Sequence, residues 1–337
     1  MKKLISLMLV FLVFGCLDGG DDGQVVVPPD DNKTVVIDIG EEENQTIVKN
    51  ETGDGDEENQ TQPWTGLNYT YEPSAKLGVY FLELCEYSTG NHTAAIFIKK
   101  GDFDMLIDTG SELTKGRVID FVKSRNIDDL DVFVSSSADY RRAGGLLDIA
   151  DEFEIEEFWW GGVKISQDYF DTVEAVGEKA KETNIVKRGY TRELNGIEIE
   201  VLNPKTNPFS DVNNDAVVLR IEDRDLTLLL LSNVQTGAQG DMVSNLGDKV
   251  MVDVVEAPYY GVGAGTANIA LFLQASQPRY MIIEGCSDET MEVEGSTRNP
   301  FKRVMEQEQY KVTYYETYVN GTVKITSDDT GYAITVE

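Results

Sequence analysis

From Pro73 to the C-terminus, hydrophobic and polar positions form alternating strand-like and helix-like stretches. Three short β-rich runs separated by polar turns open this region and predict an antiparallel meander. These runs are Val79–Leu84, Ala94–Ile98 and Met105–Asp108. Arg117–Arg125 then places Val118, Phe121 and Val122 on one face, which predicts an amphipathic helix.

Strand and helix patterns continue through the rest of the region. A strand at Asp131–Val134 leads into a polar loop and a helix after Gly144-Gly145, and a longer helix is predicted over Tyr169–Thr183. Further strands are predicted at Ile197–Leu202, Ala216–Glu222, Leu226–Leu231, Met251–Glu256 and Tyr280–Glu284. Helices near Ala267–Ala275 and Phe301–Gln309 bracket the last of these strands.

Two hairpins are predicted. Asp223-Arg224-Asp225 joins two strands, and Val312–Tyr318 and Thr322–Thr326 are expected to turn on Asn320-Gly321, the preferred pair for a type I′ turn. No internal repeat is visible. A β-meander followed by mixed β and α units, in roughly two rounds, predicts an α/β fold with two sheets packed face to face and helices outside.

The N-terminus has the pattern of a secretion signal. Two lysines precede an apolar run, Leu4–Phe14, that is far shorter than the roughly 20 residues needed to span a bilayer. Val13-Phe14-Gly15-Cys16 resembles a lipobox. We therefore expect residues 1–15 to be removed and Cys16 to carry lipid, as in an archaeal-type lipoprotein; a plain cleaved signal peptide is the alternative.

Residues 16–72 are expected to form a disordered linker. Leu17–Glu72 holds 15 acidic and two basic residues and shows no amphipathic period. It carries five Asn-x-Ser/Thr acceptors for glycosylation, and two more follow. These are Asn32, Asn44, Asn50, Asn59 and Asn68, then Asn91 and Asn320. The pattern predicts a glycosylated, lipid-anchored spacer that displays a head, residues 73–337, on the outer face of the cell membrane.

Charge and histidine content exclude several functions. The chain has 60 acidic and 29 basic residues, a net charge of −31, which argues against binding to the phosphate backbone of nucleic acids. A three-His zinc site cannot be built, because His92 is the only imidazole. His92 lies in the sequon Asn91-His92-Thr93 before a strand, so we expect an exposed loop side chain and not a catalytic base.

Other motifs carry little chemistry. No Gly-x-Ser-x-Gly nucleophile elbow occurs. Gly261–Gly265 is glycine-rich but lacks the full dinucleotide-binding spacing, so a flexible loop is the favoured interpretation over a nucleotide cradle. Trp159-Trp160 is expected in the core or at a sheet edge; two neighbours on a strand face opposite sides, which disfavours a sugar platform.

The order of several segments resembles the metallo-β-lactamase fold, and most of all the extracellular domain of ComEC-type competence proteins. The matching segments are Gly78–Leu84, Met105–Gly110, Val118–Val122, Leu130–Val134, Gly144–Leu147, Phe158–Gly161, Ile199–Pro204, Asn214–Arg220, Pro278–Ile283 and Asn320–Ile325. The resemblance spans Lys76–Glu337 and implies a four-layer αββα sandwich.

The metal-binding loop of this family departs from its pattern here. Active members carry His-Pro-Asp-Ala-Asp-His before Ile-Gly-Gly, and the matching loop is Ser137–Ala143. Asp139 is kept, but Ser137 and Arg142 stand at histidine positions and Arg141 stands at the second aspartate. A guanidinium has no lone pair and is not deprotonated in proteins, so it cannot serve as a metal ligand.

The other metal-binding elements are changed as well. Asn233 stands where the bridging aspartate of a Thr-Gly-Asp turn is expected. Tyr259 and Tyr260 replace a histidine pair, and Asn299 replaces the histidine of a Gly-His-Pro element. The resemblance therefore implies a head without a metal cofactor, and no catalytic residue is assigned.

Three interpretations of the altered site stay open. In the favoured one, Arg141 or Arg142 pairs with Asp139 or Asp108 and fills the vacated site, leaving a protein for binding or scaffolding. In the second, the arginines and Tyr140, Tyr259 and Tyr260 form a cleft for an anionic, glycan or protein ligand. The third is a residual hydrolase holding zinc or manganese weakly, with Asp108, Asp139, Ser135 and Tyr259.

A role as a ComEC-like accessory in DNA uptake is a further alternative, which the acidity opposes. With Cys16 lipidated, Cys85 and Cys286 remain, and both fall at the ends of β segments that meet near the site in the family fold. We expect a disulfide between them in an extracellular protein; two isolated buried thiols are the alternative.

Overall fold

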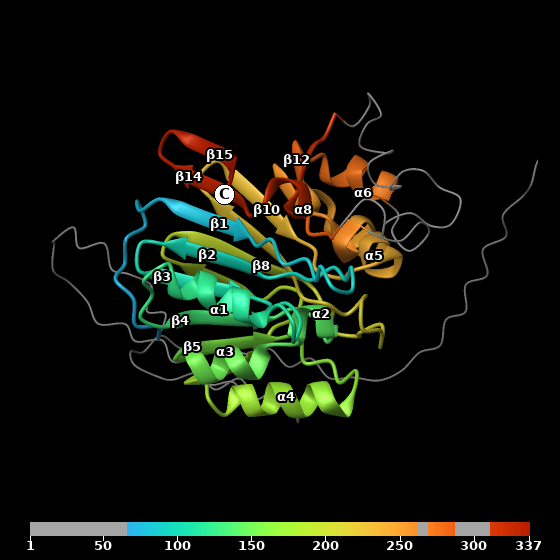
Figure 1. The fold of residues 1–337 in the computed structure, drawn as a ribbon. Helices are drawn as coiled ribbons and strands as arrows, with labels where there is room; N and C mark the ends of the chain where they lie inside the picture. Colours follow the sequence, from blue (N-terminus) through green and yellow to red (C-terminus); the bar gives the residue numbers. More distant parts are fainter. Residues whose placement is uncertain (1–65, 262–268, 287–310) are drawn as a thin grey trace, which may run out of the picture. The chain divides into compact units, whose positions relative to one another are not determined.

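The computed structural model describes residues 66–261, 269–286 and 311–337. Fifteen strands in this part of the chain form two sheets (Figure 1). The eight-stranded sheet has the order β15-β14-β1-β2-β3-β4-β5-β6, and the seven-stranded sheet has the order β13-β12-β11-β10-β9-β8-β7. No helix among the described residues has the length and apolar character needed to cross a membrane.

The first sheet opens with the antiparallel meander β1–β3 and continues with parallel β4–β6. Its strands are β1 Leu77–Phe81, β2 Ile96–Lys100, β3 Phe103–Ile107, β4 Leu130–Ser135, β5 Ile155–Trp160, β6 Glu182–Ile185, β14 Val323–Asp328 and β15 Gly331–Val336. The β-rich runs separated by polar turns predict the meander, while β5, β6 and β15 were not predicted as strands.

The second sheet combines an antiparallel half with a parallel half, β10 to β13. Its strands are β7 Thr191–Leu194, β8 Ile197–Asn203, β9 Val218–Asp223, β10 Leu226–Leu230, β11 Val254–Glu256, β12 Tyr280–Ile283 and β13 Thr313–Glu316. The predicted hairpin at Asp223-Arg224-Asp225 is confirmed between β9 and β10.

Helices cover the outer face of each sheet (Figure 1). They are α1 Lys115–Lys123, α2 Tyr140–Ala143, α3 Leu146–Glu152, α4 Gln167–Gly177, α5 Thr236–Leu246, α6 Ile269–Ser276 and α8 Thr317–Asn320, with 3-10 turns η1 Gly247–Val250 and η2 Pro258–Gly261. Three buried clusters separate the layers: one between α1, α3, α4 and the first sheet, one between the sheets, and one beneath α5 and α6. This is the αββα sandwich that the sequence predicts.

The paired tryptophans show how one strand serves two of these clusters. Trp159 joins the cluster between the sheets, whereas Trp160 joins the cluster beneath the helices. Both are buried, as expected for neighbours on an interior strand.

The predicted C-terminal hairpin is wrong. β13 lies parallel to β12 at the edge of the second sheet, whereas β14 lies between β1 and β15 in the first. Asn320-Gly321 ends the short helix α8: the N–H of Gly321 bonds the carbonyl of Thr317, and its φ of 82° is a conformation that glycine adopts freely. A residue pair that suits a tight hairpin therefore ends a helical turn where the chain crosses between sheets.

Two other boundaries differ from the prediction. The helix predicted over Tyr169–Thr183 ends at Gly177, and its last two residues begin strand β6. Residues 66–72, assigned to the linker, contact the head: the backbone N–H of Thr70 donates to Asp102 and that of Glu72 to Asn195. The helix predicted at Phe301–Gln309 lies outside the described residues, as do Cys16 and the glycosylation candidates Asn32, Asn44, Asn50 and Asn59.

Candidate functional site

The candidate site is built from loops that follow parallel strands. Asp108 follows β3, Ser136 to Arg142 follow β4, and Asn233, Tyr259 and Glu284 follow β10, β11 and β12. Because parallel strands end at one edge of a sheet, the two facing sheets bring these loops together. The structure thus gathers most of the residues selected from the sequence, while Asn299 lies outside its described part.

Arg142 occupies the centre of this cluster. Its side chain is 1% exposed. The guanidinium donates to Asn233 Oδ1 at 2.7 Å, Asp108 Oδ2 at 3.0 Å and Glu256 Oε1 at 2.7 Å. We call Arg142 with Asp108, Asn233, Glu256 and Glu284 the Arg142 centre. Burial disfavours the guanidinium charge, but the carboxylates of Glu256 and Asp108 raise the pKa of Arg142, so the cation is permanent.

Glu256 and Glu284 are the members that the sequence analysis missed. Both are 1% exposed, and Glu284 Oε2 lies 3.8 Å from the Arg142 guanidinium. Glu256 Oε2 also accepts the N–H of Ser232 at 2.9 Å. Each glutamate closes a buried apolar strand, at Val254–Glu256 and just after Tyr280–Ile283. A carboxylate at the carboxyl end of a buried strand was the available signal.

Glu284 differs from its neighbours in protonation. Burial and the adjacent charge of Glu256 raise the pKa of Glu284 well above its usual range, and Arg142 offsets this only in part. Neither carboxyl oxygen of Glu284 accepts a hydrogen bond from a donor group among the described residues. The raised pKa favours a protonated Glu284, since two adjacent carboxylates in one dry site do not both ionise readily.

Asp108 is held by several donors at once. Its carboxylate accepts the Ser136 N–H at 2.8 Å and the Ser136 hydroxyl at 2.5 Å in addition to Arg142. Burial raises the pKa of Asp108, and Arg142 and Ser136 counteract that effect. The φ of Asp108 is 62°, a left-handed conformation that is uncommon outside glycine. The strained turn aims the carboxylate at the guanidinium.

Arg141 and Asp139 form a second ion pair at the surface of the centre. Arg141 Nε donates to Asp139 Oδ1 at 2.9 Å, and Asn233 Nδ2 donates to Asp139 Oδ2 at 2.8 Å. Burial alone would raise the pKa of Asp139, but the bonds from Arg141 lower it. The guanidinium of Arg141 is therefore partly exposed and paired with Asp139, whereas that of Arg142 is buried.

Two tyrosines close one side of the centre. The Arg141 guanidinium carbon lies 5.2 Å from the Tyr259 ring centroid and 4.8 Å from that of Tyr260, and Arg142 also lies 4.8 Å from the Tyr260 ring. Tyr259 and Tyr260 have φ values of 50° and 58°. Tyr260 is fully buried, and its hydroxyl has no hydrogen-bond partner among the described residues. Cation–π contacts therefore hold the two tyrosine rings against the guanidinium groups of Arg141 and Arg142.

The prediction of an exposed His92 is wrong. His92 is 7% exposed, its ring stacks at 5.9 Å on Tyr260, and its Nδ1 accepts the N–H of Cys286 at 2.8 Å. Burial, together with the charge of Arg141, lowers its pKa to about 4. His92 is thus a neutral packing residue at the margin of the Arg142 centre, where Tyr260 and the Cys286 N–H hold its ring.

The disulfide between Cys85 and Cys286 is confirmed. It joins the segment after β1 to the segment after β12, and both sulfurs lie beside the loop that holds His92. Asn91, in the same loop, donates its side-chain amide to Glu86 at 3.0 Å. The other described acceptors are Asn68, which is exposed, and Asn320, whose Oδ1 accepts the N–H of Glu316 at 2.9 Å.

Of the remaining candidates, Ser137 lines a small cavity beside the centre, and Ser135 and Tyr140 do not. Ser137 is buried, Ser135 Oγ lies 2.9 Å from the Tyr169 hydroxyl, and Tyr140 is 60% exposed. The cavity lined by Ser136, Ser137 and Tyr169 has a volume of about 10 Å³. That is room for roughly one water molecule and not for a substrate.

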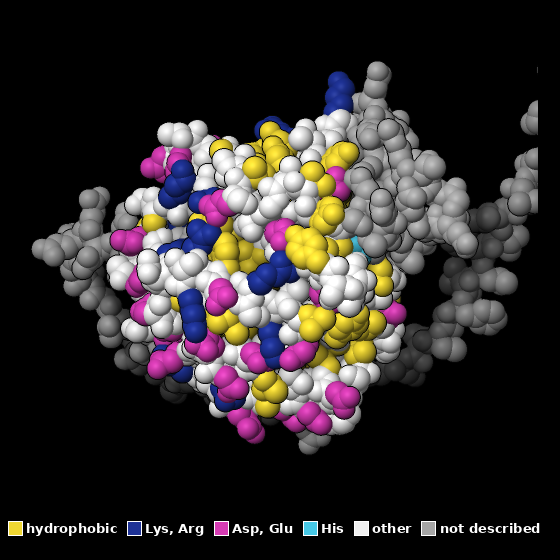
Figure 2. Space-filling model, in the orientation of Figure 1, with side chains coloured by type: hydrophobic (Ala, Val, Ile, Leu, Met, Phe, Trp, Pro, Cys, Tyr) yellow, Lys and Arg dark blue, Asp and Glu magenta, His cyan; other side chains and the backbone are white. Residues whose placement is uncertain are grey.

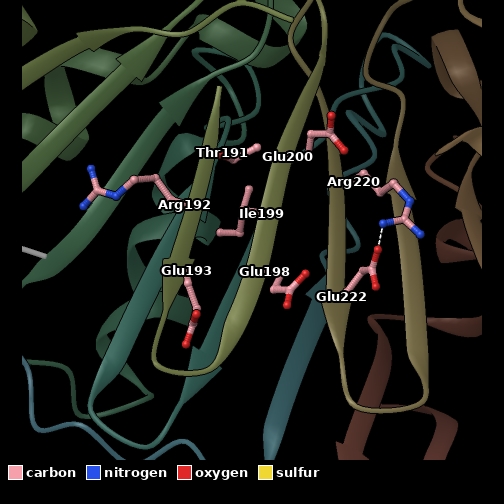
Figure 3. Close-up of a pocket in the computed structure, with 8 residues that line it drawn as sticks. All are labelled: Thr191, Arg192, Glu193, Glu198, Ile199, Glu200, Arg220 and Glu222. Atoms are coloured by element: carbon pink, nitrogen blue, oxygen red, sulfur yellow. Dashed lines mark ion pairs between the residues drawn. The ribbon is translucent and has the colours of Figure 1, made fainter. Parts of the chain in front are cut away.

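A larger hollow of about 270 Å³ lies on β7 to β9 and shares no residue with the Arg142 centre (Figure 3). Its lining is Thr191, Arg192, Glu193, Glu198, Ile199, Glu200, Arg220 and Glu222. Arg220 pairs with Glu222 across this surface. The hollow is mainly acidic and open, and it holds none of the candidate site residues selected from the sequence.

The residues of the Arg142 centre do not fit the divalent metal that active members of the resembled family bind. A fixed cation stands between the carboxylates, and within the described ranges no group of three or more His, Cys, Asp or Glu side chains is arranged to hold a metal ion. A catalytic zinc site needs about three lone-pair donors and one open position. The cluster instead has its acceptors turned to a guanidinium.

Comparison with solved structures finds metallo-β-lactamase fold proteins. The fold protein YhfI from Bacillus subtilis is 10% identical, with a TM-score of 0.47 over 71% of this chain and 96% of YhfI. Tm1679, a metal-dependent hydrolase of the beta-lactamase superfamily, is 11% identical, with a TM-score of 0.48 over 74% of this chain and 98% of its own. The Rm3 metallo-beta-lactamase is 12% identical, with a TM-score of 0.40 over 54% and 76%. No protein-family model and no curated protein matches the chain.

Proposed function

We propose that this protein is a surface-displayed binding or scaffolding protein whose metallo-β-lactamase-like head lacks the metal-dependent chemistry of that superfamily. The observation that supports this proposal is the buried Arg142 guanidinium, which donates to Asp108, Asn233 and Glu256. These acceptors surround a side chain that cannot be deprotonated and has no lone pair to offer a metal.

The energetics of the centre oppose exchange of Arg142 for a metal ion. Withdrawing the guanidinium would leave Asp108 and Glu256 buried without a cation, which costs about 3–5 kcal/mol. A metal binding beside Arg142 would instead meet its positive charge in a site of low dielectric constant. Both routes make a hydrolytic metal centre unfavourable, and the cavity beside it is too small for a substrate.

Display at the membrane surface is the second part of the proposal. It is supported by the lipobox-like sequence ending at Cys16 and by the acidic, sequon-rich stretch before the head. A chain of this composition is expected to hold the head away from the lipid surface. The exposed Tyr140 and half-buried Tyr259 then offer the ring faces at the site for a neutral ligand or a protein partner.

A DNA-uptake role has little support. On the face in Figure 2, the described Lys and Arg side chains lie among Asp and Glu side chains and form no continuous basic patch. Binding to DNA depends on such a patch, because neutralised phosphates supply most of the affinity. The net charge of −31 acts in the same direction.

Metal analysis tests the proposal. The full chain is produced in zinc- and manganese-replete medium, and its bound metal and hydrolase activity are measured. We expect substoichiometric, easily removed metal and no metal-dependent hydrolysis. The matched control is the Arg142→His, Asn233→Asp variant, which returns two donors to the centre.

Near-stoichiometric, tightly bound metal in the unaltered chain would overturn the proposal. Metal-dependent hydrolysis that is lost on substitution of Asp108 or Asp139 would establish the residual hydrolase instead. Metal binding by the control variant alone would show that Arg142 and Asn233 are what exclude the ion.

A further inference from the structure

A row of three buried carboxylates crosses the first sheet at the end opposite the Arg142 centre. Met105 pairs with Val132, and Leu130 pairs with Ile155, so Asp104, Asp131 and Glu156 lie side by side on β3, β4 and β5. Their exposures are 1%, 0% and 3%. We call these three residues the Asp131 row.

Two lysines balance only the outer members of the row. Lys99 Nζ lies 2.9 and 2.8 Å from the two carboxylate oxygens of Asp104, and Lys181 Nζ lies 2.6 Å from Glu156 Oε1. Asp131, in the middle, accepts only the N–H of Asp104, at 2.7 Å through Oδ2. Its Oδ1 is buried and has no partner among the described residues.

Further acidic groups face the row from the loops before these strands, and no additional cation among the described residues pairs with Asp131. Asp102 precedes β3, Asp128 and Asp129 precede β4, and Glu154 precedes β5. Burial, followed by the charges of Asp129, Asp104 and Glu156, raises the pKa of Asp131 to about 8 despite the Asp104 N–H. For the same leading reason the pKa values of Asp104 and Asp129 rise to about 7 and about 6.

The segment by which the chain joins the head is bound to the same acidic groups. The backbone N–H of Asn68 donates to Glu156, and that of Thr70 donates to Asp102 at 2.8 Å. Between them, the Tyr69 ring packs edge-on against Phe103 at 5.4 Å. Residues 66–72 therefore depend on the packing of the ends of β3 and β5.

We propose that Asp131 is the proton-binding residue of a pH-sensitive latch that holds residues 66–72 against the head. While Asp131 holds its proton, the negative charge of the row does not exceed the positive charge of the two facing lysines. When the proton leaves to solvent, three adjacent carboxylates face two lysines in a buried setting. The resulting repulsion separates the strand ends to which Asn68 and Thr70 are bonded.

The direction of the pH effect follows from the raised pKa values. The folded row holds more protons than the unfolded chain between about pH 4 and about pH 8. Stability contributed by the row therefore falls as pH rises through this window. The latch is closed in mildly acidic conditions and loosens under mildly alkaline ones.

The Asp131→Asn variant tests the latch, because its amide keeps an acceptor for Asp104 N–H and resembles the protonated acid. Hydrogen exchange of residues 66–72 is compared with that of the unaltered chain at the same pH. We expect exchange about tenfold or more slower in the variant at pH 8, and equal exchange at pH 5. Asp225→Asn, at an exposed turn, is the matched control and should behave as the unaltered chain.

Equal exchange of the two proteins at both pH values would overturn the latch, as would faster exchange in Asp131→Asn at both. Carbon-13 NMR of the unaltered chain gives a test without any substitution. A carboxyl titration of Asp131 near pH 8 supports the proposal. A midpoint below about pH 5, near that of an ordinary aspartate, contradicts it.

Discussion

Acidic side chains are buried in two different ways at the carboxyl ends of strands from both sheets and at the amino ends of β3, β4 and β5. At the carboxyl ends, Asp108, Glu256 and Glu284 surround the Arg142 guanidinium. At the amino ends, the middle of the Asp131 row has no cation within hydrogen-bonding distance among the described residues. A guanidinium keeps its charge at every physiological pH, whereas a buried carboxyl without one must take up a proton. The comparison teaches that the group at the centre of a buried acidic cluster decides whether the cluster responds to pH.

Removing the central cation is the most severe way to break this contrast. The Arg142→Met variant leaves Asp108 and Glu256 buried and unpaired, and we expect a loss of about 3–5 kcal/mol in the free energy of unfolding at pH 7. Denaturant unfolding measures it. Arg142→Lys keeps a positive charge but cannot donate to all three acceptors, so its loss of unfolding free energy should be smaller than that of Arg142→Met. A loss below about 1 kcal/mol in Arg142→Met would show that the guanidinium is not what holds these loops.

The two ends should also respond oppositely to acid. The pKa of His92 is lowered to about 4 by burial and by Arg141. As pH falls below 6.5, His92 is therefore protonated in the unfolded chain before it is protonated in the folded one. His92 therefore removes up to about 3 kcal/mol of stability between pH 6.5 and pH 4, while protonation of the Asp131 row adds stability in that range. Thermal unfolding between pH 4 and pH 7 should show a smaller acid loss in His92→Asn. An unchanged profile would mean that His92 is not buried as a neutral ring.

Two isosteric substitutions, Glu284→Gln and Glu256→Gln, should change the free energy of unfolding least, and their difference reports which glutamate carries the charge. Glu284→Gln should alter the free energy of unfolding at pH 7 by less than about 1 kcal/mol, because the carboxyl is already neutral. Glu256→Gln removes a charge bonded to Arg142 and should cost about 1.5–3 kcal/mol. The same denaturant assay compares both. Equal losses of unfolding free energy in the two variants would mean that both glutamates are ionised, which contradicts this prediction.

The sequence predicts the layers of this molecule better than its buried polar groups. Short β-rich runs between polar turns predict the β1–β3 meander, and the resemblance to the family predicts that Arg142, Asp139 and Asn233 belong to one site. The Asn-Gly pair at 320–321 misled because the same residues suit a hairpin and a helix end. Local chemistry alone could not separate the two.

The missed residues depend on long-range register. In the sequence, Glu256 and Glu284 are acidic residues at the ends of apolar strands. Whether they face Arg142 depends on how the two sheets pack. The Asp131 row depends on the pairing of β3, β4 and β5, which a single sequence does not specify. His92 was misplaced for the same reason, since its cover comes from Tyr260 and Cys286, far along the chain.

The central proposal is that the Arg142 guanidinium fills the site and leaves no place for a metal ion, and thermal unfolding of the full chain in the presence of zinc tests it most directly. The midpoint should be the same in a chelator and in excess zinc, because the Arg142 centre offers no vacancy. A functional site would respond strongly: zinc at 100 times its dissociation constant stabilises a folded protein by about 2.7 kcal/mol. A zinc-dependent rise of that size, lost in Asp108→Asn, would contradict the account.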